Sequence, residues 1–354
     1  MLRASDADFL WRALALAERG AGHTRPNPPV GAVVVRDGKI IGEGWHRRAG
    51  TDHAEVAAIK DALRKSGKGA ASPLRGATIY VTLEPCSRPG RVGACTDAIV
   101  ASGIRNVVYA VSDPNPTNRG RAKRVLAKAG VSCEAVRRGA CAAREWEACG
   151  GFRSLQEAAR HLIAPFAKHV TTGWPYVTVK LAMSLDGRIC DNWGEAKWIT
   201  SATSRKVVGW ERAVVDAIMV GAETVRRDNP SLLSHNRRND DLIRVVVSRS
   251  GRLPGKAQVF ADGKNPTLVF KDAKTALREL GKRGALHVLC EGGLKLATSL
   301  ADQGLVDRWI AVTAPIVIGS RHLKDALRLR PYAGGMSDPV AGDCEERYER
   351  MPNA

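Results

Sequence analysis

The sequence predicts an α/β protein of two domains. Apolar runs typical of strands alternate with amphipathic segments typical of helices, which indicates layered α/β structure. From about residue 141 to 173 a helical stretch without strand signals interrupts this alternation. The 354 residues, 44% of them hydrophobic, suffice for two cores of ordinary size. We therefore expect domains at residues 1–145 and 175–354, joined by a linker at 146–174.

The elements of the first half follow from local signals. Ser5-x-x-Asp8 resembles a capping box, and the amphipathic pattern over 9–19 ends at Gly20. Asp37-Gly38 is a strong hairpin turn between apolar runs. We expect strands at 30–36, 39–41, 78–83, 106–111 and 131–136, and helices at 9–19, 53–64, 96–102 and 122–129.

The second half repeats the alternation without an internal sequence repeat. We expect strands at 176–182, 217–220, 243–248, 267–270, 287–290 and 309–317, with helices between them.

One group of residues in the first half has the composition of a catalytic zinc site. His53, Cys86 and Cys95 offer an imidazole and two thiolates, which suit Zn²⁺. Three protein ligands leave a fourth tetrahedral position open for water, as in catalytic rather than structural sites. Pro85-Cys86 follows an apolar run, so the first thiolate lies just past a strand. We expect one zinc ion per chain.

Glu55 adds a general acid/base to this group. The order H-x-E, then P-C, then a later cysteine is typical of zinc deaminases of nucleobases, in which the glutamate moves protons without binding the metal. Eight residues, 87–94, separate the two cysteines instead of the usual two, and the longer loop could reach over a substrate. A lone cysteine is usually a small buried side chain, and we interpret the other cysteines in this way: Cys133, Cys141, Cys149, Cys190, Cys290 and Cys344.

Composition bears on the cellular location of the protein and on its binding partners. The first residues lack the apolar core of a signal peptide, and no apolar run is long enough to span a bilayer. Eight cysteines in so long a chain do not indicate a disulfide framework, so we expect a cytoplasmic protein. The formal charge of +19 fits nucleic acid, anionic small molecules or merely a solvated surface. With 5% aromatic residues, the chain has no clear stacking platform for single strands.

The second half carries two weaker signals. Glu291-Gly292-Gly293 lies between an expected strand and helix, where glycines let backbone approach a phosphate, although a tight turn explains the pair as well. Lys180, Ser184 and Asp186 lie near a strand end, where ligands of α/β sheets bind, although a polar loop with an Asp-Gly turn is an equal interpretation.

Together the motifs resemble the bifunctional deaminase–reductase family of riboflavin biosynthesis over nearly the whole chain. In the first half the resemblance rests on Pro26-Asn-Pro-Pro-Val-Gly31, Gly42-Glu-Gly-Trp-His46, His53-Ala-Glu-Val56, Thr82-Leu-Glu-Pro-Cys86, Cys95 and Asp113-Pro-Asn-Pro116. In the second half it rests on Leu181-Ala-Met-Ser-Leu-Asp-Gly-Arg188, Trp198-Ile-Thr-Ser201, Thr224, Asp228-Asn-Pro230, Glu291-Gly-Gly293 and Gly304-Leu-Val-Asp307.

This resemblance implies a three-layer cytidine-deaminase-like domain followed by a dihydrofolate-reductase-like domain. The first would hydrolyse an amine from 2,5-diamino-6-(5-phosphoribosylamino)pyrimidin-4-one. The second would use NADPH to reduce the ribosyl group to ribityl. The implied partner is this phosphorylated pyrimidine, and we expect a homo-oligomer, a dimer or tetramer, without membrane or nucleic acid.

The resemblance also assigns residues. His53, Cys86 and Cys95 match zinc ligands, and Glu55 matches the proton shuttle. The positions that match the deaminase substrate site are Asn27, His46, Arg91, Asp113 and Asn115. The positions that match the NADPH site are Ala182, Trp198, Thr200, Thr224, Asp228, Ser248, Gly292 and Gly293. The positions that match the reductase substrate site are Lys180, Ala196, Arg212, Leu232, His235 and Glu291, and Lys180 is also the catalytic candidate for polarising the carbonyl.

Several positions depart from the family pattern. Arg88-Pro89 stands where His-His is usual, Ala196 where Ser is usual, His235 where Arg is usual and Ser248 where Asp is frequent. A histidine is a weaker, pH-dependent cation for a phosphate than an arginine. The zinc motif itself is intact.

Two other functions share part of the pattern. A tRNA adenosine deaminase has H-A-E and P-C, and the charge of +19 suits it, but it does not need the second domain or Glu291-Gly-Gly293. An inactive nucleic-acid-binding protein on a deaminase scaffold would not need the intact set of His53, Glu55, Cys86 and Cys95.

Overall fold

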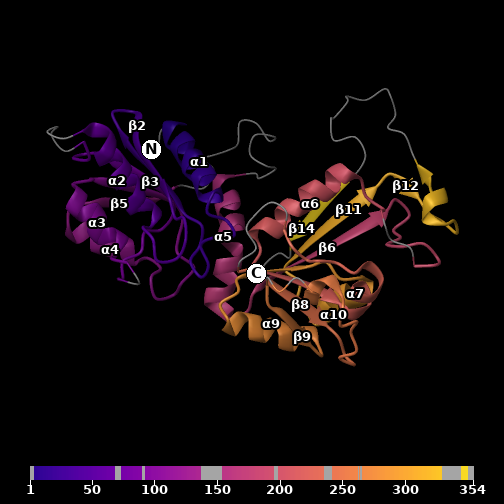
Figure 1. Ribbon diagram of the computed structural model, residues 1–354. Coiled ribbons are helices and arrows are strands. Elements are labelled where there is room, and N and C mark those ends of the chain that lie inside the picture. The colour runs from indigo at the N-terminus through magenta and orange to yellow at the C-terminus, as the bar shows by residue number, and fades with distance from the viewer. Residues whose placement is uncertain are drawn as a thin grey trace, which may run out of the picture. The chain divides into compact units, whose positions relative to one another are not determined.

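The computed structural model describes residues 4–67, 73–89, 92–136, 154–194, 198–234, 241–261, 263, 265–328 and 344–349. The chain forms two compact units, Met1–Gly173 and Trp174–Ala354, and each has its own α/β sheet (Figure 1). The predicted α/β class is therefore confirmed. None of the helices that the structure describes combines the length and apolar composition that crossing a bilayer requires.

The first unit is built on a five-stranded sheet in the order β2-β1-β3-β4-β5. β1 is antiparallel to β2 and β3, whereas β3, β4 and β5 run parallel. The strands are β1 (Gly31–Arg36), β2 (Lys39–Trp45), β3 (Thr78–Leu83), β4 (Asn106–Val111) and β5 (Ser132–Ala135). The helices are α1 (Ala4–Glu18), α2 (Ala54–Ser66), α3 (Cys95–Ser102), α4 (Arg121–Lys128) and α5 (Leu155–Thr172).

Alternate side chains along these strands build two cores, one on each face of the sheet. Ile79 and Val107 pack with residues of α2, α3 and α4, while their neighbours Tyr80 and Val108 pack with residues of α1 and α5. The unit is therefore a three-layer α/β/α sandwich, as predicted.

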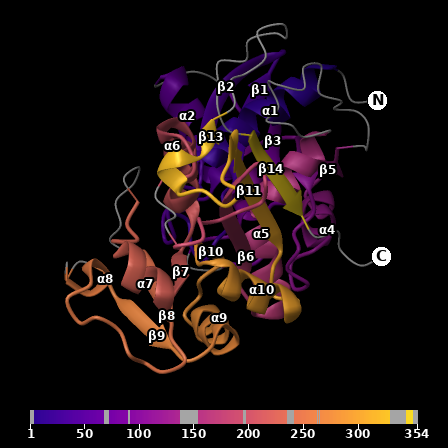
Figure 2. The same ribbon diagram turned by 90° about the vertical axis from the view of Figure 1, so that its right-hand side faces the viewer.

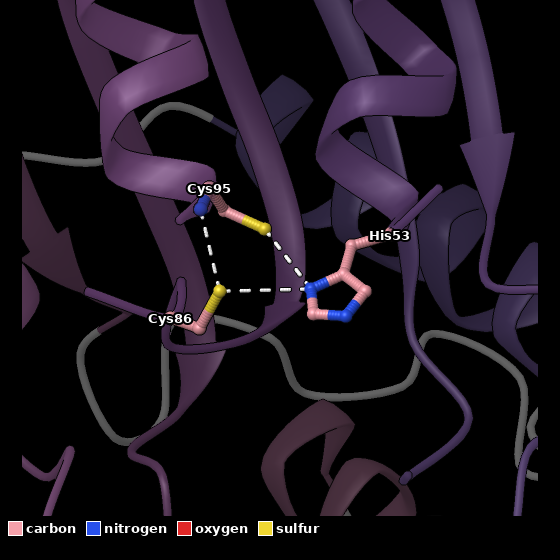
Figure 3. A group of neighbouring side chains, drawn as sticks. All are labelled: His53, Cys86 and Cys95. Atoms are coloured by element: carbon pink, nitrogen blue, oxygen red, sulfur yellow. Dashed lines mark hydrogen bonds between the residues drawn. The ribbon is translucent and has the colours of Figure 1, made fainter. Parts of the chain in front are cut away.

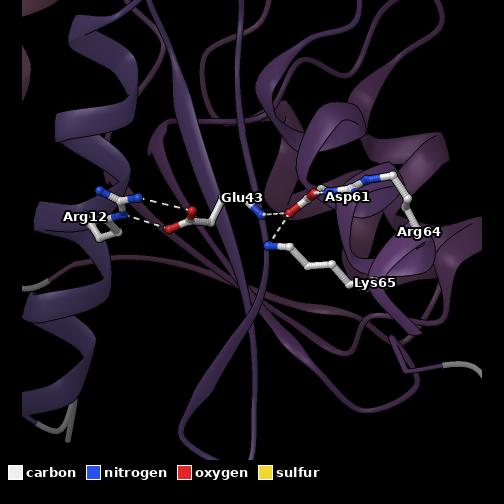
Figure 4. Close-up of polar contacts among 5 residues, drawn as sticks. All are labelled: Arg12, Glu43, Asp61, Arg64 and Lys65. Atoms are coloured by element: carbon white, nitrogen blue, oxygen red, sulfur yellow. Dashed lines mark hydrogen bonds and ion pairs between the residues drawn. The ribbon is translucent and has the colours of Figure 1, made fainter. Parts of the chain in front are cut away.

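An ion pair to α1 and a hydrogen bond to α2 hold the edge strand β2 to helices on both faces (Figure 4). Arg12 of α1 donates to Glu43 of β2 with Nε–Oε1 and Nη2–Oε2 distances of 2.6 and 3.1 Å. The backbone N–H of Glu43 donates to Asp61 of α2, which also pairs with Arg64 and Lys65. Partial burial acts to raise the pKa of Asp61, but these hydrogen bonds outweigh it and lower that pKa to about 2.

The second unit is built on a seven-stranded sheet in the order β14-β11-β6-β10-β7-β8-β9. Its strands are parallel except for β14, which pairs antiparallel with β11. They are β6 (Tyr176–Ser184), β7 (Ala217–Gly221), β8 (Ile243–Val247), β9 (Thr267–Phe270), β10 (His287–Cys290), β11 (Arg308–Ala314) and β14 (Cys344–Glu349).

Helices cover both faces of this second sheet. The helices are α6 (Ala202–Val214), α7 (Ala222–Asp228), α8 (Gln258–Ala261), α9 (Ala273–Lys282) and α10 (Leu294–Asp302). Helices α9 and α10 lie side by side and share one core with Val179 and Val288 (Figure 2). Helices α7 and α8 pack with Ile218 and Val246, whose side chains lie on the other face.

The last strands differ from the prediction in two ways. The strand expected over 309–317 is two strands, β11 and the short β12 (Ile316–Val317), which pairs with β13 (Leu327–Arg328). Pro315 lies between them, and a proline lacks the N–H that would continue the ladder. Strand β14 was not predicted, because a six-residue segment with three glutamates and an arginine has no apolar pattern.

The segment expected as a linker contains α5. Leu155, Ala158 and Ile163 are buried in the core that α1 shares with the first sheet, so this helix packs in the first unit. Residues 137–153 lie outside the described part of the chain. The limits 1–145, 146–174 and 175–354 stay a proposal for the functional domains.

Candidate active sites

The three predicted zinc ligands converge in the first unit (Figure 3). His53 is the N-cap of α2, Cys86 follows β3, and Cys95 is the first residue of α3. The loop after β3 doubles back, since the N–H of Cys95 donates to Cys86 Sγ at 3.3 Å and the N–H of Thr96 donates to the Cys86 carbonyl at 3.1 Å. Local backbone contacts thus bring residues 86 and 95 together despite the long loop.

Their geometry suits zinc. The Nδ1 atom of His53 lies 3.2 Å from Cys95 Sγ and 3.5 Å from Cys86 Sγ, and all three ligand atoms lie within 4.8 Å of one another. Zn–N and Zn–S bonds in a tetrahedron separate their ligand atoms by about 3.5–3.8 Å. One borderline nitrogen and two soft sulfurs at these separations fit a single Zn²⁺ ion.

The two thiols differ sharply in acidity. Hydrogen bonds from Cys95 and His53 outweigh burial and lower the pKa of Cys86 to about 4. The interaction with Cys86 and burial raise the pKa of Cys95 well above its usual value. Without a metal, the two sulfurs therefore share one proton. A bound metal dication would instead hold both sulfurs as thiolates.

Glu55 is buried in the first turn of α2 and is not a member of this ligand group among the described residues. Burial, followed by the nearby Cys86, raises its pKa to about 7. A carboxyl group that changes protonation near neutral pH is suited to move protons.

A cavity of about 420 Å³ adjoins the ligand group. His53, Glu55 and Cys86 line it, and so do four residues predicted to bind substrate: Asn27, His46, Asp113 and Asn115. Arg91, the fifth, lies outside the described residues. Two further lining residues, Glu84 and Asn118, were missed from the sequence; Glu84 belongs to the motif Thr82-Leu-Glu-Pro-Cys86, whereas no sequence signal marks Asn118.

His46 is held as a neutral ring with a defined tautomer. Its Nδ1 lies 3.0 Å from the Asp52 carbonyl, which can only accept, so Nδ1 carries the proton. Nε2 then accepts from the Asn27 amide at 3.0 Å. Burial lowers the pKa of His46, which keeps the ring uncharged. The Asn27 amide is thereby oriented at the cavity wall.

In the second unit, three predicted substrate residues form a charged cluster. Arg212 on α6 donates to both oxygens of Glu291 with two 2.6 Å bonds, and its Nη1 donates to the Leu233 carbonyl at 3.2 Å. Burial lowers the pKa of Lys180, the negative charge of Glu291 opposes this, and the smaller effect of the Arg212 charge adds to the lowering. An amine with a lowered pKa gives up a proton more readily.

The two glycines after Glu291 lack side chains for different reasons. A Cβ on Gly292 would lie 2.7 Å from Leu296 Cδ2 and 3.3 Å from the Gly221 nitrogen, so a side chain there would displace the end of Leu296 and crowd the backbone of Gly221. Gly293 has φ −65° and ψ 173°, which any residue adopts, and a Cβ there would meet no described atom within 4 Å. Neither backbone nor neighbours require Gly293, whose position at the start of α10 suits an anion.

Predicted cofactor residues follow neighbouring parallel strands. Thr224 and Asp228 lie on α7 after β7, Ser248 follows β8, and Gly292-Gly293 follows β10. Because β10, β7 and β8 are adjacent and parallel, their carboxyl ends share one edge of the sheet, where ligands of such sheets bind.

The remaining predicted residues have varied surroundings. Ala182 lies on β6, Thr200 is buried before α6, and the exposed Trp198 ring has the Arg205 guanidinium 4.2 Å from its centre. The side chain of Leu232 is buried in the core, so a contact with substrate would come from its backbone. Ala196 and His235 lie outside the described residues.

The comparisons with known proteins agree with this arrangement. The profile of the cytidine and deoxycytidylate deaminase zinc-binding region matches residues 3–111, and that of the RibD C-terminal domain matches residues 175–330. Riboflavin biosynthesis protein RibD of Aquifex aeolicus is 34% identical over 363 residues, which cover 93% of this chain and 95% of that protein. The chain belongs to the RibD family.

Other RibD proteins show the same full-length similarity. RibD of Escherichia coli is 36% identical and covers 89% of each chain. Among solved structures, the deaminase/reductase of Thermotoga maritima has a TM-score of 0.79 at 32% identity and covers 98% of this chain and 99% of its own. RibD of Acinetobacter baumannii has a TM-score of 0.75 at 32% identity with the same coverage.

As a RibD protein, the chain is a bifunctional enzyme of riboflavin biosynthesis, a zinc-dependent deaminase joined to an NADPH-dependent reductase. This confirms the predicted fold class, enzyme class and cofactors. The tRNA adenosine deaminase and the inactive nucleic-acid-binding protein are not favoured, because the RibD C-terminal profile accounts for the second half.

Proposed function

We propose that this chain deaminates 2,5-diamino-6-(5-phosphoribosylamino)pyrimidin-4-one and then reduces the ribosyl group of the product to ribityl. The observation that supports this proposal most strongly is the cavity beside the zinc ligands. It is lined by the buried Glu55 and by four polar side chains suited to a pyrimidine. The solved relative from Thermotoga maritima is named for the same pair of activities.

In the deaminase site His53, Cys86 and Cys95 hold the metal. Bound zinc supplies Lewis acidity that makes water a nucleophile near neutral pH. Glu55 takes a proton from the attacking water and returns it to the departing amine, so that ammonia leaves and the water oxygen stays on the ring carbon. Asn27, held by the neutral His46, binds the ring, and Asp113, Asn115 and Arg91 bind the ribose phosphate portion.

In the reductase site the cofactor binds along the carboxyl edge of β10, β7 and β8. Bound NADPH supplies the hydride. The N–H of Gly293 at the start of α10 would donate to its phosphate, and the remaining cofactor contacts would come from Ala182, Trp198, Thr200, Thr224, Asp228, Ser248 and Gly292. Lys180 polarises the carbonyl, and the substrate is held by Arg212, Glu291, the Leu232 backbone, Ala196 and His235.

One experiment tests both halves. The protein is incubated with the diamino-pyrimidinone phosphate, with and without NADPH, and the products are identified by mass spectrometry. We expect the deaminated ribosyl compound without NADPH and the deaminated ribityl compound with it. Absence of ammonia release, together with inosine formation in tRNA, would favour the adenosine deaminase instead.

The setting of the enzyme is proposed on chemical grounds. Zinc-binding thiolates persist under reducing conditions, which supports a cytoplasmic location. We propose that the enzyme is a homo-oligomer, either a dimer or a tetramer, and that it has no nucleic-acid or membrane partner. Sedimentation analysis of the purified enzyme tests the oligomeric state.

A further inference from the structure

Two loops border the deaminase cavity. The metal loop, residues 84–89, follows β3 and contains Cys86. The substrate loop, residues 112–120, follows β4 and contains Asp113 and Asn115. Because β3 and β4 are adjacent and parallel, both loops leave the same edge of the sheet. Side-chain hydrogen bonds then decide how these loops sit against each other.

Glu84 anchors the substrate loop at its two ends. Its Oε2 accepts from the N–H groups of Asp113 and Gly120 at 3.2 and 3.1 Å, and its Oε1 accepts from Ala122 at 3.3 Å. These donors include the first amides of α4, where a carboxylate is favourable. Glu84, itself the first residue of the metal loop, therefore fixes where the substrate loop begins and ends.

Asn118 connects the two loops directly. Its Oδ1 accepts from both the backbone N–H and the hydroxyl of Ser87, each at 2.9 Å. Its Nδ2 donates to Asp113 Oδ2 at 2.8 Å. One buried side chain, 5% exposed, thus links the residue after Cys86 to a carboxylate that lines the cavity.

The chemistry of these contacts requires an amide. The Ser87 N–H can only donate and an ionised Asp113 can only accept, so the orientation of the Asn118 amide is fixed by its partners. Aspartate would keep the acceptor but set a second carboxylate against Asp113, and leucine would offer neither group. Asp113 also uses its Oδ1 to accept from the Asn115 N–H at 2.8 Å, so its position affects that neighbour.

We infer that Asn118 is a positioning residue of the deaminase, which sets the spacing between the metal loop and the substrate-binding side chains of Asp113 and Asn115. It orients these groups through Asp113 and Ser87. Loss of the amide leaves the zinc ligands in place and misplaces the groups that bind the ribose phosphate portion. The effect falls on substrate binding more than on the chemical step.

The test compares Asn118→Ala, Asn118→Asp and Ser87→Ala with a matched control, Asn106→Ala, an exposed asparagine at the start of β4. Asn118→Ala is expected to raise the KM for the pyrimidine about tenfold, since it removes buried hydrogen bonds to a charged group, with kcat changed less than about threefold. Asn118→Asp is expected to raise KM at least as much. Ser87→Ala keeps the backbone contact and loses only the hydroxyl contact, so its KM is expected to rise less than that of Asn118→Ala. The control Asn106→Ala is expected to stay within about twofold.

Zinc content and thermal midpoint are measured for each variant. A merely structural role predicts loss of zinc or a fall in kcat with KM unchanged, and either result would overturn the inference. If Asn118→Ala does not fold, the comparison of Asn118→Asp with wild type decides the matter by the same KM criterion.

The inference rests on the proposed deaminase function, and the two can fail separately. If the wild-type enzyme releases no ammonia from the pyrimidine, the function itself is wrong. If wild type is active and folded Asn118 variants keep its KM, only the positioning role is wrong.

Discussion

At the scale of single residues, the deaminase site is a set of groups whose protonation is set by burial and by each other. The hydrogen-bonded contact between the two thiols lowers the pKa of Cys86 and raises that of Cys95, and burial lowers the pKa of His46. His53, Cys86 and Cys95 were predictable because their residue types and order match a known ligand pattern. Asn118 was not, because its role depends on contacts to Ser87 and Asp113 that only the folded loops create.

Replacing Cys86 by serine should remove the metal. A hydroxyl is a poor zinc ligand near neutral pH, so two protein ligands remain. We expect Cys86→Ser to carry less than about a tenth of the wild-type zinc and to release no ammonia. Metal analysis by mass spectrometry, beside a deamination assay, checks this. A variant that kept full zinc would contradict the ligand assignment.

Replacing Glu55 by glutamine should separate proton transfer from metal binding. Glu55 is outside the ligand group, so Glu55→Gln should keep about one zinc per chain. Deamination should fall by about a hundredfold or more, because an amide cannot carry the proton to the leaving amine. NADPH-dependent reduction of pre-deaminated substrate serves as the control. A parallel loss of reduction would contradict separate roles for the two halves.

The two glycines of the reductase should respond differently to added side chains. At Gly293 the added side chain meets no described protein atom, so Gly293→Val should keep the thermal midpoint and raise the KM for NADPH about tenfold or more. At Gly292 the added methyl meets Leu296 and Gly221, so Gly292→Ala should cost about 1–3 kcal/mol of stability. Thermal unfolding and reductase kinetics of both variants distinguish the effects. Equal losses of stability would refute the assignment.

At the scale of elements, most helices and strands were predictable and a few were not. Apolar runs and the Asp37-Gly38 turn gave the strands of the first sheet within a few residues. Periodicity did not reveal the break at Pro315, because the residues on both sides are apolar. It also missed β14, whose place in the sheet comes from pairing with β11 rather than from its own composition.

The contact that Asp61 of α2 makes with Glu43 of β2 should weaken in acid. The folded pKa of Asp61 is about 2, below its ordinary value of 3.8, so its stabilisation is complete above about pH 4 and is lost as the pH falls through 2. Asp61→Asn should therefore lower the unfolding free energy at pH 7 by about 1 kcal/mol, since both of its charged partners, Arg64 and Lys65, are exposed.

Urea unfolding of wild type and Asp61→Asn at pH 7, 4 and 2.5 measures this difference. The gap between the two proteins should shrink at the lowest pH. Asp37, an exposed carboxylate that pairs with Arg36, provides the control, because Asp37→Asn should change stability little at any of these pH values. A gap that stayed constant with pH would contradict the assignment.

At the scale of the whole molecule, two separate units carry two chemistries. The zinc ligands belong to the first unit, and the charged cluster of Lys180, Arg212 and Glu291 belongs to the second. The sequence predicted this division because the two motif sets occupy separate halves. It did not predict that α5 packs with the first sheet, because helical periodicity does not reveal which core a helix joins.

Removing the metal should therefore abolish deamination and leave reduction intact. Treatment with a strong chelator should abolish ammonia release and leave NADPH-dependent reduction of pre-deaminated substrate within about twofold of the untreated rate. Added Zn²⁺ should restore deamination, and Mg²⁺, which prefers oxygen ligands, should not. Loss of both reactions on chelation would show that the second unit depends on zinc in the first.

The packing of α5 also determines where a separately folding deaminase fragment can end. Leu155, Ala158 and Ile163 shield Val108 and Ala110 of the sheet from water. A deaminase fragment that stopped at residue 145 would expose this hydrophobic surface to solvent and would therefore self-associate. A fragment that continued to Gly173 would retain its own cover, so a stand-alone deaminase cut from this chain needs the helix that precedes the reductase.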